Sequence, residues 1–112
     1  MNDEAEVMNE TANKRKMILS KANECVNGQR DAQYGNPENN FQTIAMLWMN
    51  YLEAAGATAV GSDDIYIRPK DVAAMLALLK ISRIATGAPK LDNWIDLAGY
   101  AACGGEIDDT NE

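Results

Sequence analysis

Apolar positions recur along the chain with the period of amphipathic α-helices. Between residues 12 and 26, Ile18, Ala22 and Cys25 fall on one stripe, at the three- and four-residue spacing of a helix face. Gly28 follows the last of these positions, as expected beyond a helix C-terminus. A first helix is therefore predicted over residues 12–26.

A helix start signal precedes the second apolar pattern. Asn36 can cap a helix, Pro37 suits the first helical position, and Glu38 places an acid in the first turn. Apolar residues then follow at the spacing of one face until Gly56. We predict a helix over residues 37–55. Four aromatic side chains are expected in the core. Three of them, Phe41, Trp48 and Tyr51, lie in this helix, and Trp94 lies in the last predicted helix.

The third pattern is apolar on almost every side. It begins at Pro69, after a 12-residue connection over residues 57–68, and continues to Ile84 before Gly87 ends it. A helix without a polar face is usually buried on all sides. This helix is therefore predicted to be the central one.

The fourth predicted helix covers residues 92–103 and ends at Gly104-Gly105. Its small residues would let a neighbouring backbone come close. Neither the alternation of β-strands nor a βαβ rhythm is present in the sequence. The predicted fold class is all-α, a four-helix bundle-like single domain packed around its apolar third helix.

Charge is distributed unevenly along the chain. The 112 residues contain 17 acids and 10 bases, a formal charge of -7. Eight of the acids lie in the first ten and last seven residues, so residues 11–105 hold 10 bases against 9 acids. We predict acidic disordered tails over residues 1–11 and 106–112, around a helical domain over residues 12–105. Such a domain has no basic stripe for extended nucleic-acid binding, but a phosphorylated ligand remains compatible with it.

Several classes of function are excluded or disfavoured by composition. The absence of histidine excludes Ser-His-Asp and Cys-His catalysis and any histidine metal cage. The longest apolar run, residues 72–79, is far shorter than the ~20 residues that a membrane span needs. The two cysteines and the lack of a signal-like opening favour a soluble, cytoplasmic protein.

Two carboxylates and two bases form the first candidate site. Asp92 and Asp96 are four residues apart on one helix face, so they could hold a divalent cation such as Mg²⁺. Lys80 and Arg83 interrupt the apolar third helix and need acidic partners, for which the two aspartates are suited. The four residues therefore form either a structural salt-bridge network or a site for a phosphate and a metal.

A second candidate region precedes the second helix. Arg30 and Tyr34 could offer a guanidinium group and a stacking ring to a nucleotide, although the same residues are also typical of a turn with an aromatic plug. Six methionines, with Met46 and Met49 on the less apolar side of the second helix, suggest an adaptable contact surface in a homo-oligomer.

Three blocks of sequence resemble a family of small phage and prophage proteins of unassigned function. They read RDAQYGNPENNF at residues 30–41, PKDVAAMLALLKISR at residues 69–83 and DNWIDLAGYAACG at residues 92–104. The first helix and both tails lie outside this resemblance. It implies a protein of the bacterial host cell, and Asn40 of the first block joins Arg30, Tyr34, Lys80 and Arg83 as an expected ligand-binding residue.

The lysine–arginine helix followed by an aspartate helix is also loosely similar to all-α MazG-type nucleotide pyrophosphohydrolases. Those enzymes hold Mg²⁺ with an E-x-x-E helix and a later E-x-x-D helix. Here the second predicted helix offers Glu38 and Glu53, which are too far apart for E-x-x-E, and Asp92-x-x-x-Asp96 stands in place of E-x-x-D. The leading hypothesis is therefore an accessory protein that binds a nucleotide or another phosphorylated small molecule. The alternatives are a divergent metal-dependent pyrophosphohydrolase using Asp92 and Asp96, and a non-enzymatic protein-interaction module.

Overall fold

The computed structural model describes residues 3–28, 37–59, 61 and 64–110. Four helices account for most of them, and the described residues include no strand. The helices are α1 (Asp3–Asn27), α3 (Pro37–Ala54), α4 (Pro69–Thr86) and α5 (Leu91–Thr110). The all-α, single-domain fold class predicted from the periodicity is thus confirmed.

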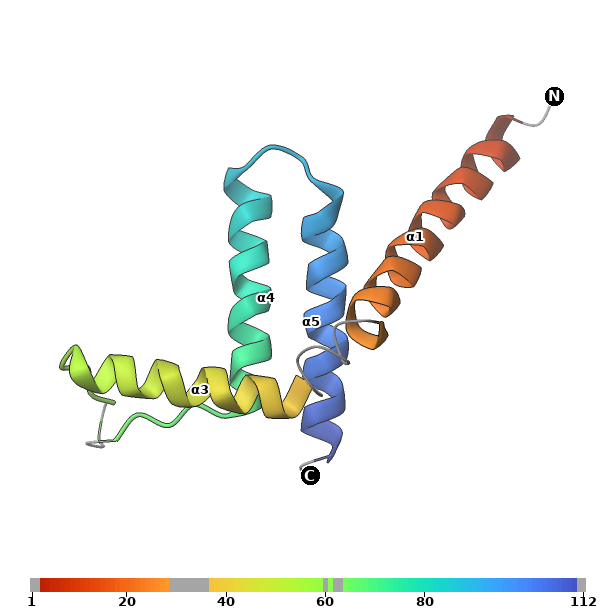
Figure 1. The fold of residues 1–112 in the computed structure, drawn as a ribbon. Helices are drawn as coiled ribbons and strands as arrows, with labels where there is room; N and C mark the ends of the chain where they lie inside the picture. The colour runs from red at the N-terminus through yellow and green to blue at the C-terminus, as the bar shows by residue number, and fades with distance from the viewer. Residues whose placement is uncertain (1–2, 29–36, 60, 62–63, 111–112) are drawn as a thin grey trace.

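The helices α4 and α5 form an antiparallel hairpin that is the centre of the structure (Figure 1). At the foot of this hairpin α3 crosses it at a steep angle, while α1 packs against α5 and then projects away from the other helices (Figure 1). The radius of gyration is 17.9 Å, against roughly 13 Å for a compact chain of this length. The molecule is therefore elongated.

The hydrophobic core lies where α3, α4 and α5 meet. Val72 is completely buried there, and the connection before α4 contributes Ile67. The backbone N–H of Ile67 donates a hydrogen bond to Sδ of Met49, at 3.3 Å. The remaining buried members of this cluster are Phe41, Ala45, Ala73, Cys103 and Ile107. The connection before α4 forms no strand in its described residues; the side chain of Ile67 anchors it to the core instead.

The central helix is α5, not α4 as predicted. Among the described residues α5 contacts α1, α3 and α4, whereas α4 packs against α3 and α5. Small residues explain the difference: the Cβ of Ala73 would lie 3.0 Å from a Cβ built on Gly104, and Cγ1 of Val26 would lie 3.3 Å from one built on Gly99. Neighbouring helices can approach α5 closely from two sides.

Both acidic segments, for which we predicted disordered tails, are helical in the residues that the structure describes. Helix α1 already begins at Asp3. Helix α5 continues through Gly104-Gly105 to Thr110 because Ile107 is buried in the core. Tertiary packing therefore overrides the stop signal of the two glycines.

Local signals do determine where the other helices end. After α3, Gly56 has φ = 86°, a left-handed conformation that favours glycine. The N–H of Ala57 then donates to the carbonyl oxygen of Leu52 at 2.9 Å, which closes the helix end. The predicted start of this helix at Pro37 and its end next to Gly56 are confirmed.

Candidate functional site

The predicted cluster of bases and acids forms only in part. Nζ of Lys80 lies 2.7 Å from Oδ2 of Asp96, between α4 and α5. The Lys80 side chain is only 10 % exposed, whereas that of Asp96 is 36 % exposed. Since a buried ammonium group needs a compensating charge, Asp96 is the residue that allows Lys80 to lie inside the helix pair.

Arg83 and Asp92 are exposed and remain apart from this ion pair. Neither side chain makes a hydrogen bond or salt bridge within the described part of the chain. Arg83 lies in the last turn of α4 and Asp92 in the first turn of α5, where each charge interacts favourably with its helix dipole. Both positions therefore have a local structural role without any ligand.

The proposed Mg²⁺ ligands gain no further partners in the structure. Residues 3–28, 37–59, 61 and 64–110 contain no group of three or more acids or cysteines arranged to hold a metal ion. Asp96 is also already paired with Lys80. A metal ion at Asp92 and Asp96 stays a prediction without geometric support.

The other predicted ligand-binding residues do not join the cluster. Arg30 and Tyr34 lie outside the described residues. Asn40 is half-buried in the first turn of α3, which crosses the foot of the hairpin (Figure 1). Lys80 lies eleven residues along α4 from Pro69, about 16 Å at the helical rise per residue. Asn40 and Lys80 thus belong to different ends of the hairpin.

A second charged arrangement, which sequence analysis missed, lies at the start of α4. The backbone N–H of Arg68 donates to Oδ2 of Asp71 at 2.8 Å, and its Nε donates to the same oxygen at 3.0 Å. Its Nη2 donates to Oδ1 at 3.2 Å. These side-chain hydrogen bonds hold the pKa of Asp71 below its ordinary value of 3.8 and raise the pKa of Arg68.

Next to this pair a polar groove opens between α3, α4 and the end of α5. Tyr66 is 77 % exposed beside it, and Nζ of Lys70 lies 3.0 Å from Oδ1 of Asp108. The groove is lined by Glu38, Gln42, Tyr66, Arg68, Pro69, Lys70, Ile107 and Asp108. The sequence signal for it was the long connection over residues 57–68, which ends at Arg68 just before Pro69.

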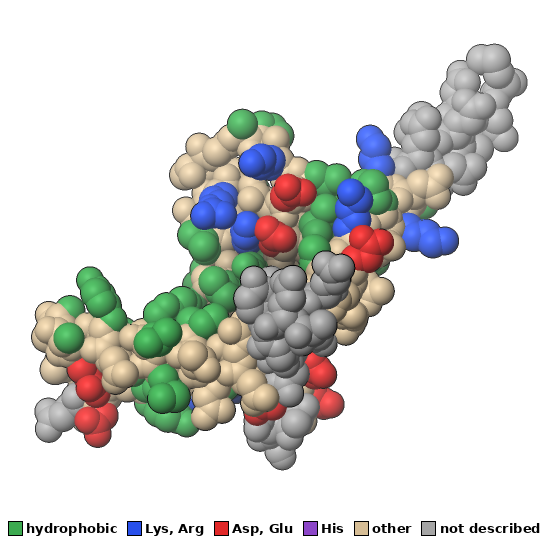
Figure 2. Space-filling model, viewed as in Figure 1, with side chains coloured by type: hydrophobic (Ala, Val, Ile, Leu, Met, Phe, Trp, Pro, Cys, Tyr) green, Lys and Arg blue, Asp and Glu red, His purple; other side chains and the backbone are tan. Residues whose placement is uncertain are grey.

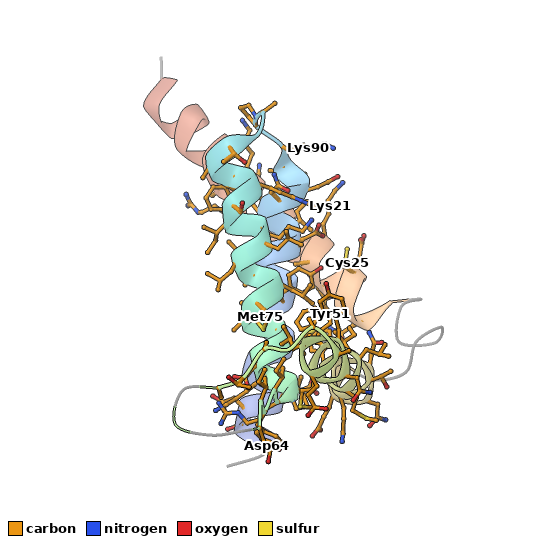
Figure 3. The ribbon with its side chains drawn as sticks, turned by 90° about the vertical axis from the view of Figure 1, so that its left-hand side faces the viewer. Lys21, Cys25, Tyr51, Asp64, Met75 and Lys90 are labelled. Atoms are coloured by element: carbon orange, nitrogen blue, oxygen red, sulfur yellow. The ribbon has the colours of Figure 1, made fainter. Side chains whose placement is uncertain are left out.

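Large apolar side chains on the outside of the hairpin form the most extensive unexplained feature. Leu78 is 62 % exposed and Trp94 is 51 % exposed, although both were expected in the interior. We call one set of these residues the outer apolar surface; it comprises Leu78 and Ile81 of α4 with Leu91 and Trp94 of α5. Met75 and Leu79 are exposed on another side of α4, since Leu79 is two residues and about 200° of helix rotation from Ile81. Tyr51 of α3 is also exposed rather than in the core, and it lies with Met75 on the side of the molecule seen in Figure 3.

Apolar side chains are exposed on α3 as well. Met46 and Leu47 are solvent-exposed, and Figure 2 shows hydrophobic side chains gathered along α3 and at the foot of α4. Met49, in contrast, is half-buried and accepts the hydrogen bond from the Ile67 N–H. The exposed contact surface suggested by the methionines thus includes Met46 but not Met49.

Comparison with protein families gives one match that covers most of this architecture. The family described as "Domain of unknown function (DUF6378)" matches residues 17–108. The chain belongs to this family. The family region includes the second half of α1, which the sequence resemblance had left out, together with α3, α4 and nearly all of α5.

Two curated relatives are phage proteins. The chain is 36 % identical over 86 residues to the "Gene 55 protein" of Mycobacterium phage D29, and 39 % identical over 84 residues to the "Gene 55 protein" of Mycobacterium phage L5. These alignments cover 77 % and 75 % of this chain but only 50 % and 47 % of the relatives. The chain thus spans about half the length of the curated relatives it matches.

These findings confirm the predicted phage protein family of unassigned function. The looser similarity to MazG-type enzymes is not among them and stays a prediction. The search of solved structures gave no significant match. Within the described residues, no helix combines the length and apolarity needed to cross a membrane.

Proposed function

We propose that this family member is a non-enzymatic interaction module that uses exposed helix faces to bind proteins. The observation that carries the proposal is the outer apolar surface, where α4 presents Leu78 and Ile81 and α5 presents Trp94 to solvent. Leu78 and Ile81 are three residues apart and share one face of α4, and large apolar side chains exposed together on one face are typical of protein contacts. Tryptophan is also among the residues most often found at the centre of binding surfaces.

The charged residues support the same reading. Lys80 is compensated by Asp96 inside the hairpin, so the ion pair braces the two helices and leaves little charge for a ligand. An interaction module needs a firm scaffold beneath its contact face, and this pair contributes to one. The Lys80–Asp96 pair, one part of the cluster first considered as a phosphate site, thereby serves the scaffold in this proposal.

Site-specific photo-crosslinking in bacteria expressing the chain tests the proposal. A benzophenone amino acid replaces Leu78 in one variant and Lys14, an exposed polar position on α1, in the matched control. We expect a discrete crosslinked species at position 78 and none at position 14. Its partner, identified by mass spectrometry, should bind again when purified. Equal or absent crosslinking at both positions would overturn the proposal.

A second candidate function is the binding of a phosphorylated small molecule in the polar groove at the foot of α4. The specific observation is that an exposed ring, Tyr66, and two cationic side chains, Arg68 and Lys70, line one groove. An aromatic face and cationic groups together suit a nucleotide. Both cations have acidic partners, so a ligand must compete with Asp71 and Asp108.

A thermal-shift panel of nucleotides with and without Mg²⁺ tests this second candidate. Binding in the groove predicts a raised melting temperature that is lost in Tyr66→Ala but retained in Tyr51→Ala, an exposed tyrosine outside the groove. No shift with any nucleotide would exclude it. Pyrophosphate release from the same nucleotides, compared with Asp96→Asn, tests the remaining enzyme hypothesis.

A further inference from the structure

An apolar groove runs between α4 and α5 on the side of the hairpin away from α3. Its lower half is formed by small residues, Ala74 and Ala77 of α4 with Ala101 and Gly105 of α5. Lys70 and Asp108 close it at the foot. Helix α1 packs elsewhere on α5, because it approaches Gly99, which is two residues and about 200° of helix rotation from Ala101. Neither α1 nor α3 covers this groove.

Large side chains continue the same face above the groove. Ile81 follows Ala77 by four residues, and Trp94 precedes Ala101 by seven, so each lies on the same helix face as the small residue below it. Both side chains are about half exposed. The lower half of this face therefore carries small side chains that leave a groove, and its upper half carries large apolar side chains that protrude.

We propose that this face binds the same face of a second copy of the chain, with the two hairpins antiparallel. A two-fold axis places the bulky half of each copy in the hollow half of the other. Trp94 then lies against Gly105 of the second copy, and Ile81 lies against Ala74 of the second copy. The two hairpins form a four-helix bundle, the arrangement that neither hairpin can make alone.

A single position of the two-fold axis brings Trp94 opposite Gly105 and Ile81 opposite Ala74 of the second copy. Ala73 lies level with Gly104 and Lys80 level with Asp96, which fixes the register of α4 against α5. An axis that crosses α5 between residues 99 and 100 exchanges positions 94 and 105. At this level it crosses α4 between residues 77 and 78, and there it exchanges positions 81 and 74. The large and the small residues of both helices are thus paired by the same symmetry axis.

The charges at the two ends of the face are complementary under the same axis. Lys90 is exposed at the upper end and Asp109 at the lower end of α5, and neither makes an ion pair within the described residues. The axis between residues 99 and 100 exchanges positions 90 and 109. Each end of the interface thereby gains a pair of opposite charges at its rim, which favours the antiparallel orientation over the parallel one.

The exposed area of the chain is larger than that of a compact monomer of the same mass. The chain exposes 8293 Å², whereas a compact monomer of 12.2 kDa exposes roughly 6,100 Å². The surplus of roughly 2,000 Å² exceeds the ~800 Å² that each partner buries in a standard interface. The surplus includes the exposed surface of the projecting α1 (Figure 1), and it leaves room for an interface of that size on the hairpin.

Sedimentation velocity of the full chain under reducing conditions tests the dimer, since the exposed Cys25 would otherwise crosslink copies. The expected species has twice the mass of 12.2 kDa at micromolar concentration. Ala101→Trp, which fills the groove from an exposed position, should give a monomer with unchanged helix content by circular dichroism. Tyr51→Ala, an exposed position on α3, is the matched control and should remain dimeric.

Charge exchange tests the orientation. Lys90→Glu alone should weaken the dimer several-fold, and the double variant Lys90→Glu with Asp109→Lys should restore the affinity of the original chain. A monomer at all concentrations up to the hundred-micromolar range, a dimer that survives Ala101→Trp, or a dimer abolished by Tyr51→Ala would each overturn the proposal. Failure of the double variant to restore affinity would overturn the antiparallel arrangement.

This inference rests on the proposed function, because it names a second copy as the partner of the exposed surface. The two fail differently. A monomer in solution that still crosslinks specifically to another protein at position 78 would reject self-association and retain the interaction module. A dimer that makes no contact with any other protein in cells would retain the inference and limit the proposed function to self-assembly.

Discussion

Lys80 and Asp96 form an ion pair at 2.7 Å in which the base is almost buried and the acid reaches the surface. The pair joins α4 to α5 in the upper part of the hairpin. Because removal of either partner leaves the other without compensation, the pair constrains which substitutions the hairpin tolerates.

Asp96→Asn is expected to destabilise the fold by about 1–3 kcal/mol, because it leaves a buried ammonium group without its counter-charge. Urea denaturation measures the loss. Asp92→Asn is the matched control, since Asp92 is exposed and unpaired among the described residues, and should change stability by less than about 0.5 kcal/mol. Equal effects of the two substitutions would show that the ion pair contributes no more than a surface charge.

The helices were predictable from sequence because their signals are local. Pro37 and Pro69 begin α3 and α4 as expected, and the partnership of Lys80 with an acid on the next helix followed from the cost of burying a lone charge. The arrangement of the helices was not predictable. Whether Leu78 is buried depends on where the other helices pack, and periodicity carries no information about that.

Two apolar residues of α4, one buried and one exposed, should differ in how much their truncation lowers the stability of the fold. Val72 is fully buried, and Val72→Ala should cost about 2 kcal/mol because it removes two methyl groups from the core. Leu78 is 62 % exposed, and Leu78→Ala should change the stability of the fold by less than about 0.5 kcal/mol. Both are measured by urea denaturation. A large loss for Leu78→Ala would place that side chain in an interface or a core.

The charged pair and the polar groove at the start of α4 were not predicted from the sequence, for a different reason. The hydrogen bonds from Arg68 to Asp71 depend on side-chain rotamers at a helix start, and the sequence indicated only that an acid occupies the first turn. The polar groove beside them arises because the loop before Pro69 folds against α3 and the end of α5. Contacts between residues far apart in the chain have no signature in its local pattern.

The Arg68–Asp71 interaction predicts a specific acid sensitivity. Because the folded state lowers the pKa of Asp71 below 3.8, its contribution to stability is complete above that value and is lost as the pH falls below it. Asp71→Asn should lower stability at pH 7 by about 0.5–1 kcal/mol, and the variant and the original chain should converge near pH 2. Urea denaturation at both pH values measures this. A difference that stays constant with pH would show that the charge of Asp71 is not responsible.

Adjacent glycines in α5 give a matched test of how closely α4 approaches. A Cβ on Gly104 would lie 3.0 Å from the Cβ of Ala73, whereas a Cβ on Gly105 would meet nothing within 4 Å. Gly104→Val should therefore destabilise the fold by about 1–3 kcal/mol by forcing the helices apart. Gly105→Ala should stabilise it by about 0.5–1 kcal/mol through helix propensity. Both substitutions are compared in the Ala101→Trp background, where self-association does not contribute, by thermal and urea unfolding. If Gly104→Val were tolerated as well as Gly105→Ala, the close contact between α4 and α5, and with it the register used to place the two-fold axis, would be incorrect.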